Sequence, residues 1–138
     1  LKLEEKEDYY IVTGIERFNE NIVIPSQYKG KDVKEFEEDA FSGNDNIKSI
    51  TIPDSVTTIN ESAFHSCTSL ETIVISKRLE VINNFAFTKC DSLKTIFNNS
   101  NLVFNVGDKA NGNIALYALN IYNVGEWSYQ NGTPTPNN

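Results

Sequence analysis

The hydrophobic positions in the middle of the chain recur every 23 residues. This distance is much longer than the period of a helix or of a strand, so the pattern indicates a repeat of whole structural units. The positions that share the spacing are Ile50 and Ile73, Ile52 and Ile75, Val56 and Leu79, Ile59 and Ile82, Ala63-Phe64 and Ala86-Phe87, Cys67 and Cys90, and Ser69-Leu70 and Ser92-Leu93. Units of this kind stack on one another, and the chain is therefore predicted to be a repeat array.

Each repeat predicts one turn of a coil. Ile50 and Ile52 alternate with polar residues, which indicates a short strand with one face in the core. Pro53 has no N–H to donate and ends that strand. Val56 and Ile59 then return to the interior from the opposite wall, and an Ala-Phe pair adds one small and one large core side chain. Since one turn cannot bury its own top and bottom, the core forms only when the turns stack.

The predicted fold class is accordingly a repeat solenoid, mainly β, of about four turns across residues 21–110. In the fourth unit the apolar frame weakens, because Asn98 stands where Ile75 stood and Asn105 where Ile82 stood. We expect the array to end there.

Residues 1–20 are expected to form an N-terminal cap. The β-branched and aromatic residues of 8–15 and 21–24 predict two strands, and the polar stretch between them predicts the turn of a hairpin. The first turn of the array carries extra residues within 25–33. We expect this insertion to be a surface loop with a tight bend at residues 29–31.

A C-terminal cap is predicted for residues 111–130. Asn113 is a suitable N-cap residue, and the apolar residues that follow it have helical spacing, so we expect a short capping helix. These apolar residues are Ile114, Tyr117, Ala118 and Ile121. Trp127 is expected to pack a last strand on the cap. Residues 131–138 have the composition of a linker and are expected to be a disordered tail.

Composition and charge narrow the classes of partner. The net charge of −7 and the isoelectric point near 4.7, without any basic run, argue against nucleic acid as a partner. Apolar runs fall short of the roughly 18 residues that a membrane-spanning helix needs, so we expect no membrane insertion. The first ten residues are acidic, and we expect no signal peptide within this segment. An acidic group, best interpreted as a solvated face since it lacks the spacing of a calcium loop, comprises Glu35, Glu37, Glu38 and Asp39.

Cys67 and Cys90 occupy equivalent positions in adjacent repeats, and two interpretations follow. Stacked side chains that point into the interior favour buried free thiols, whereas a strand spacing of about 4.8 Å also permits a disulfide. His65 alone is too few ligands for a metal site, and we predict neither metal nor cofactor. His65, Ser66 and Cys67 would form a nucleophile cluster only if Cys67 were exposed. Its repeat position indicates burial, so we predict that the chain is not an enzyme.

The repeat unit resembles a known one. Residues 47–69 and 70–92 carry the order Leu-x-x-Ile-x-Ile-Pro-x-x-Val-x-x-Ile-x-x-x-Ala-Phe-x-x-Cys-x-Ser, which is similar to the leucine-rich repeats of the BspA-like family. This sequence departs from the family pattern at Ser76, where Pro is usual, at Asn44, where Cys is usual, and throughout the fourth unit. The resemblance implies a right-handed parallel-β solenoid, and it supplies no shared catalytic residues.

The same resemblance implies a function and a location. Such arrays occur on proteins exported to the surface of host-associated bacteria, and in some parasitic protists, with adhesive or ligand-binding roles. We therefore expect a secreted or cell-surface binding module that recognises a protein or glycan of a host or of a neighbouring cell. The alternative is a structural spacer that presents a neighbouring domain. The sequence predicts no oligomeric state.

A candidate binding row follows from the alternation within the strands. If the repeated isoleucines face inward, the residues between them face outward, and the 23-residue spacing aligns four of them in one column. The column consists of Val23, Thr51, Val74 and Phe97, flanked by Asn21, Ser49, Thr72 and Thr95. As a binding surface it requires exposed Val74 and Phe97. The competing interpretation is ordinary sheet chemistry, with Phe97 covered by the C-terminal cap.

Overall fold

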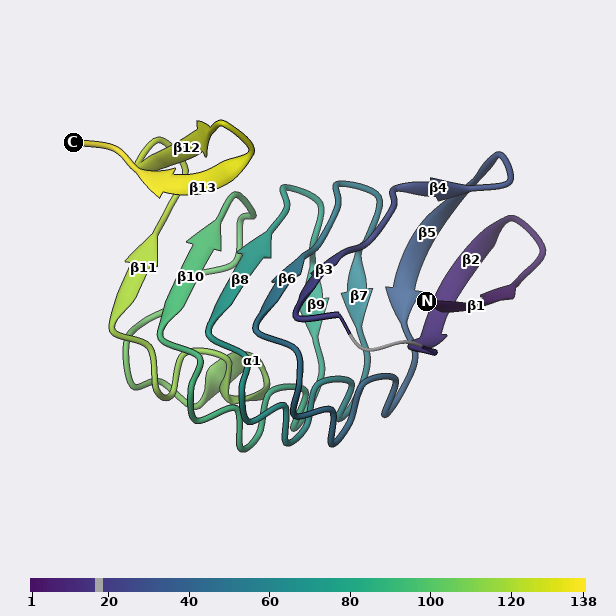
Figure 1. Cartoon of the computed structure of the whole chain (residues 1–138), viewed down its shortest axis with the longest axis horizontal. Helices are drawn as coiled ribbons and strands as arrows, with labels where there is room; N and C mark the ends of the chain where they lie inside the picture. The colour runs from purple at the N-terminus through teal and green to yellow at the C-terminus, as the bar shows by residue number, and fades with distance from the viewer. Residues whose placement is uncertain (17–18) are drawn as a thin grey trace.

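The computed structural model describes residues 1–16 and 19–138, and shows two sheets that face each other across a shared core (Figure 1). The turns that contain β3, β6 and β8 contribute one strand to each sheet, whereas β10 and β11 extend only the five-stranded sheet. The five-stranded sheet has the order β11-β10-β8-β6-β3. Its strands are β3 (Asn21–Val23), β6 (Ser49–Thr51), β8 (Thr72–Ile75), β10 (Thr95–Asn98) and β11 (Asn120–Tyr122). All of its neighbouring strands are parallel, as a coil requires.

The second sheet has six strands in the order β1-β2-β5-β7-β9, with β4 paired to β5. Its strands are β1 (Lys2–Glu5), β2 (Tyr9–Gly14), β4 (Gln27–Tyr28), β5 (Lys31–Phe36), β7 (Thr58–Ile59) and β9 (Val81–Ile82). A separate C-terminal hairpin consists of β12 (Trp127–Gln130) and β13 (Thr133–Pro136). The mainly β solenoid predicted from the repeat is therefore confirmed.

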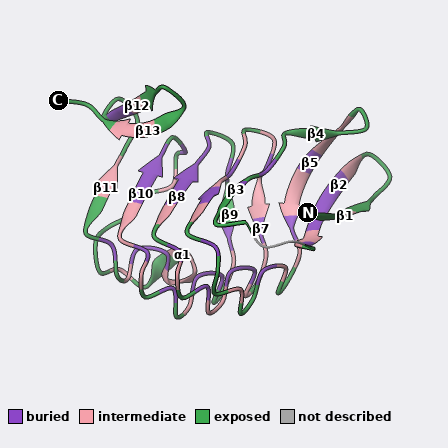
Figure 2. Cartoon of the chain, viewed as in Figure 1, coloured by how far each residue is buried: buried purple, intermediate pink, exposed green. Residues whose placement is uncertain are grey.

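Buried segments recur along the strands of successive turns (Figure 2). Their side chains form ladders that run along the stack. Ile50, Ile73 and Ile96 are aligned by the parallel register and are fully buried. A second ladder is aromatic: the rings of Phe64 and Phe87 stack at 5.0 Å between centroids with an interplanar angle of 8°. Because each turn buries its neighbour's side chains, the predicted core frame is correct.

The two cysteines are buried free thiols, which selects the first of the two interpretations. The Sγ of Cys67 donates to the carbonyl oxygen of Phe41 at 3.2 Å, and that of Cys90 to the carbonyl oxygen of Phe64 at 3.0 Å. The neighbouring Cys67 thiol, together with burial, holds the pKa of Cys90 well above its ordinary value. Both thiols thus act as small core residues that bond to the turn before them.

The N-terminal hairpin exists, but its strands differ from the predicted pair. β1 pairs antiparallel with β2, whereas β3, expected as the second hairpin strand, opens the five-stranded sheet. The reason is burial: Ile22 and Ile24 belong to the core and draw this segment into the stack. Residues 17 and 18 of the predicted turn lie outside the described residues.

The insertion in the first turn is a β-hairpin rather than a loop. β4 and β5 pair antiparallel around Lys29 (φ 48°) and Gly30 (φ 81°), which confirms the predicted bend. Tyr28 packs edge-to-face on Tyr10 with ring centroids 5.1 Å apart. The insertion thereby covers the N-terminal end of the core.

The predicted C-terminal capping helix is wrong. The single helix among the described residues, α1 (Ala110–Asn113), has four residues and is interrupted by non-helical backbone at Asn111 and Gly112. The following segment is a corner that leads into β11, whose Ile121 pairs with Ile96 of β10. The array therefore has about five turns, and its strands continue to residue 122 instead of ending near 110.

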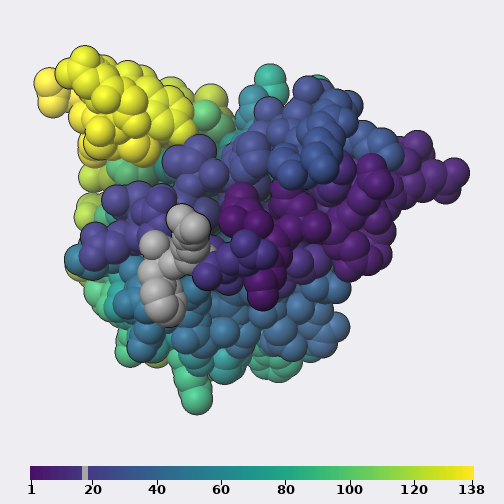
Figure 3. Space-filling view, turned by 45° about the vertical axis from the view of Figure 1, so that its right-hand side comes forward, coloured from purple at the N-terminus to yellow at the C-terminus, as the bar shows by residue number. Residues whose placement is uncertain are grey.

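The C-terminal tail also differs from the expectation. Residues 133–136 form β13 and pair with β12, so the disordered tail predicted for 131–138 is wrong. Asn131 (φ 53°) and Gly132 (φ 80°) adopt the left-handed conformations of a tight two-residue hairpin turn. Figure 3 shows this hairpin standing out from the body of the stack.

Candidate ligand-binding groove

Two rows of side chains project from the outer face of the five-stranded sheet. The parallel register aligns Val23 with Thr51, Thr51 with Val74, and Val74 with Phe97. The predicted column is therefore confirmed, and β11 extends it with Tyr122, which pairs with Phe97. A polar row runs beside it and consists of Asn21, Ser49, Thr72, Thr95 and Asn120. The outer face thus carries one largely apolar row and one polar row.

The C-terminal hairpin covers part of the apolar row. Trp127 packs on Phe97 with ring centroids 5.2 Å apart, and Tyr122 stacks on Phe97 at 5.3 Å. Consequently Val74 is 4% and Phe97 5% exposed, and the expectation that both are accessible is wrong. Val23 lies beyond the reach of the hairpin and is 70% exposed. The apolar row is buried at one end and open at the other.

A buried polar network fixes the hairpin to the stack. Asn98 takes the core position that Ile75 holds in the preceding turn, and its Nδ2 donates to the carbonyl oxygen of Leu102 at 2.9 Å. Its Oδ1 accepts from the backbone N–H and the hydroxyl of Ser100 at 2.9 and 2.6 Å. The carbonyl oxygen of Asn98 accepts from the indole Nε1 of Trp127 at 3.3 Å. The side chain of Asn98 thus holds the loop at Ser100 and Leu102, while its main-chain carbonyl anchors Trp127 of the hairpin.

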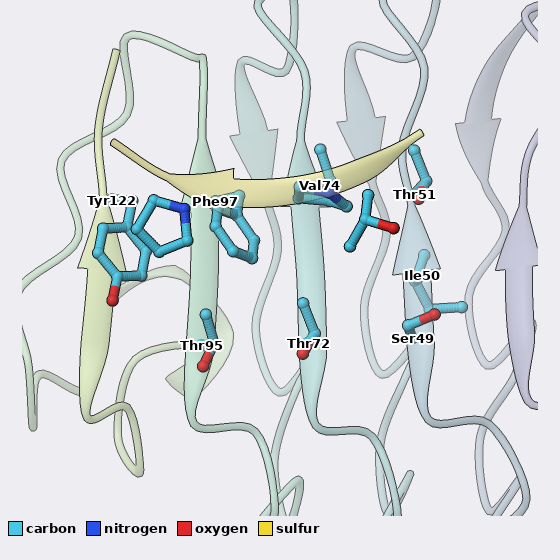
Figure 4. Close-up of a pocket in the computed structure, with 11 residues that line it drawn as sticks. Ser49, Ile50, Thr51, Thr72, Val74, Thr95, Phe97 and Tyr122 are labelled. Carbon is cyan, nitrogen blue, oxygen red and sulfur yellow. The ribbon is translucent and has the colours of Figure 1, made fainter. Parts of the chain in front are cut away.

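A groove of about 460 Å³ remains between the hairpin and the sheet. Figure 4 shows the hairpin ribbon crossing above the strands, with Phe97, Val74 and Thr51 beneath it and Thr95, Thr72 and Ser49 in a second row. Its roof consists of Thr133, Pro134 and Pro136. Such a partly enclosed space with apolar walls and a few polar groups is typical of a small-ligand site.

The catalytic interpretation of the His65-Ser66-Cys67 cluster has little geometric support. Ser66 Oγ lies 2.9 Å from Nδ1 of His65, but the thiol of Cys67 is buried and bonds inward to Phe41. Across the described ranges 1–16 and 19–138, no three His, Cys, Asp or Glu side chains are placed to hold a metal ion. Nor does any helix in those ranges have the length and apolar character to cross a bilayer.

The fold is a parallel coil in which each turn adds a short strand to the five-stranded sheet. Together with its isoleucine and phenylalanine ladders, it defines a leucine-rich-repeat solenoid. The sequence matches the family model described as the BspA type leucine rich repeat region, in six copies, over residues 16–131. The chain belongs to this family, as the repeat pattern predicted.

Two solved structures have the same fold. TpLRR, a leucine-rich repeat protein of T. pallidum, superposes with a TM-score of 0.66 at 33% identity over 69% of this chain. A leucine-rich repeat protein from Bacteroides ovatus superposes with a TM-score of 0.62 over 91% of this chain, and at 23% identity it shows the fold alone. The present chain spans 45% and 35% of the lengths of those two chains. A comparison of the sequence with curated proteins finds no significant match.

Reasoning from the sequence missed Tyr122 and the roof of the groove. The sequence pattern places Tyr122 within the predicted C-terminal cap and does not mark it as a strand residue. The roof depends on a hairpin whose turn dipeptide, Asn131-Gly132, is the strongest short-range hairpin signal in a sequence. That signal could have identified β12 and β13. The contact of Trp127 with Phe97 is a long-range one that no local pattern encodes.

Proposed function

We propose that the chain is a non-catalytic binding module of an exported bacterial protein, and that it recognises a protein or glycan at the cell surface through the outer face of its five-stranded sheet. The observation that carries this proposal is the groove between that face and the C-terminal hairpin. Of the outer column, Thr51 lines this groove and Val23 is exposed on the neighbouring strand. Thr51 and Val23 would contact the partner directly.

Two further features support binding over catalysis. The family and the solved neighbours are leucine-rich repeat proteins, and the described chain has a buried Cys67 in place of an accessible nucleophile. Val74 and Phe97, buried beneath the hairpin, would act by holding the roof in place rather than by contact.

The test is a matched pair of valine substitutions. Val23 lies on the outer face of the five-stranded sheet and Val81 on the second sheet, and both are exposed, at 70% and 43%. Screening the unaltered protein against extracellular-matrix proteins and a glycan array would identify a ligand. We expect Val23→Lys or Thr51→Lys to weaken binding of that ligand while Val81→Lys leaves it unchanged, with the melting temperature of each variant as the folding control. Equal binding by all three variants would contradict the assignment of the outer face.

A further inference from the structure

We propose that the groove under the C-terminal hairpin binds an uncharged saccharide chain, laid across the strands between the hydroxyl row and the roof. This inference rests on the proposed function and names the chemical class of its ligand. It follows from the charge, the hydrogen-bonding groups and the orientation of the groove, taken in turn.

The groove is neutral in an otherwise acidic protein. The net charge of the chain is −7, yet none of the described residues that line the groove is charged. A charged ligand would lose its hydration there without gaining a counter-charge, which is costly. An uncharged polar ligand avoids that cost, so the lining selects against acidic and basic partners alike.

The floor offers a line of hydroxyl groups. Ser49, Thr72 and Thr95 stand in register on adjacent strands, about 4.8 Å apart, which is on the scale of one sugar ring. The Ser49 hydroxyl already donates to Oδ1 of Asn21 at 2.7 Å. Within the described residues, the hydroxyls of Thr72 and Thr95 have no protein partner and are only half-buried. Each hydroxyl both donates and accepts, as the hydroxyls of a saccharide do.

The apolar side of the groove complements the other face of a sugar ring. Tyr122, which stacks on Phe97 with an interplanar angle of 20°, lines one wall, while Pro134 and Pro136 line the roof. A pyranose has a face of C–H groups that packs on such surfaces and an edge of hydroxyls that needs polar partners. Apolar walls with a few placed polar groups supply both.

A peptide strand fits this site less well. Extended peptides bind by pairing their backbone with a free sheet edge. The groove lies instead over β6, β8 and β10, whose backbone groups already pair with the neighbouring strands. A peptide backbone there would be left with unpaired donors and acceptors.

The roof of the groove is preformed, since Trp127 is 6% exposed and hydrogen-bonded to Asn98. A preformed site lowers the ordering cost of binding a flexible chain.

The test measures binding of defined oligosaccharides to the whole chain by titration calorimetry. The probes are cellohexaose, maltohexaose and N-acetylchitohexaose, which are neutral, and hexagalacturonate, which is acidic. We expect at least one neutral probe to bind and the acidic probe not to bind. The double substitution Thr72→Val and Thr95→Val should weaken that binding about ten-fold or more, since it removes two hydrogen-bonding groups and keeps the side-chain shape. Thr58→Val, on the second sheet, is the matched control and should have no effect.

The possible failures are distinguishable. Absence of binding by all neutral probes at millimolar concentration, or equal binding of the acidic probe, overturns the saccharide inference. If Val23→Lys nevertheless weakens binding of a protein ligand, the proposed function stands and only the saccharide inference fails. A neutral probe that binds the double variant as tightly as the parent overturns the saccharide inference, because that probe then lies outside the groove. If the ligand found in the screen also binds Val23→Lys and Thr51→Lys as tightly as the parent, the proposed function fails as well.

Discussion

The indole ring of Trp127 packs on the ring of Phe97 at 5.2 Å and donates its N–H to the carbonyl of the next residue, Asn98. Phe97 belongs to the outer face of the stack, and Trp127 opens the C-terminal hairpin. This contact converts a flat sheet face into a groove with a roof. The apolar cluster that results, formed by Val74, Phe97 and Trp127 with Tyr122 at its margin, is separate from the main core.

Replacing Trp127 should release the hairpin without unfolding the stack. In Trp127→Ala the hairpin loses its buried anchor. Truncating a fully buried aromatic side chain costs about 3–5 kcal/mol. We expect amide hydrogen exchange in residues 127–136 to become fast while β6 and β8 keep their protection. Val124→Ala is the control, since Val124 is 66% exposed. Uniform loss of protection in all strands would show that the hairpin is part of the main cooperative unit.

The aromatic ladder should dominate the stability of the core. Phe64 is fully buried between Phe41 and Phe87, so Phe64→Ala should lower the free energy of unfolding by about 3–5 kcal/mol. Phe85 is 54% exposed, and Phe85→Ala should change it by less than about 0.5 kcal/mol. Urea denaturation followed by circular dichroism measures both. Similar midpoints for the two variants would contradict the core frame.

Gly112 should be the least replaceable glycine of the last turn. Its φ is +63°, and an added Cβ would lie 2.7 Å from the carbonyl oxygen of Asn83 and 2.8 Å from the backbone nitrogen of Ala86. Gly107, with φ +81°, has open space around it. Gly107→Ala should therefore cost about 1–2 kcal/mol for its backbone conformation alone, and Gly112→Ala about 1–3 kcal/mol more for the clash. Thermal melts of the two variants compare these costs directly.

The buried thiol of Cys90 should make stability fall in alkaline solution. Its pKa is raised in the folded state by the neighbouring Cys67 thiol and by burial, whereas the unfolded value is about 8.5. A raised acid pKa stabilises the fold below the unfolded value, and this contribution is lost as the pH rises above it. Between about pH 7 and pH 10, the urea midpoint of the parent should fall more than that of Cys90→Ala. Because the two proteins differ only at residue 90, the comparison isolates the contribution of that thiol.

Most of the fold could be predicted because the repeat encodes it directly. Ile50, Ile73 and Ile96 recur at one spacing, so the same pattern yields the strand, its inward face and its register. The strand of the last turn was not predicted, because Ile121 pairs with Ile96 at a spacing of 25 residues, two more than the regular spacing. The corner of that turn also has apolar residues at the spacing expected for a helix. The corner residues of every repeat, such as Phe64, Cys67 and Leu70, lie three or four positions apart, as the apolar residues of a helix do.

The candidate site was predictable only in part. The alignment of the outer column follows from alternation within strands and is correct. The exposure of Val74 and Phe97 depends on which distant segment covers them, and this is a matter of tertiary packing that the repeat does not encode. Asn98 illustrates the difference. In the sequence it marks the point where the repeat pattern weakens. In the fold its side chain accepts a hydrogen bond from Ser100, and its main-chain carbonyl accepts one from Trp127.

The direction of the bonds between turns has a mechanical consequence. Bonds such as those from the backbone N–H of Ile52 to Val74 and of Phe64 to Ala86 join consecutive turns and run along the axis of the stack. The two ends of the chain lie at opposite ends of that axis (Figure 1). Tension applied through the two ends of the chain pulls these hydrogen bonds along their own direction, a few at a time. The turns should therefore open one after another, whereas strands loaded in shear resist together. The domain would thus lengthen stepwise under load, giving way at its end turns first.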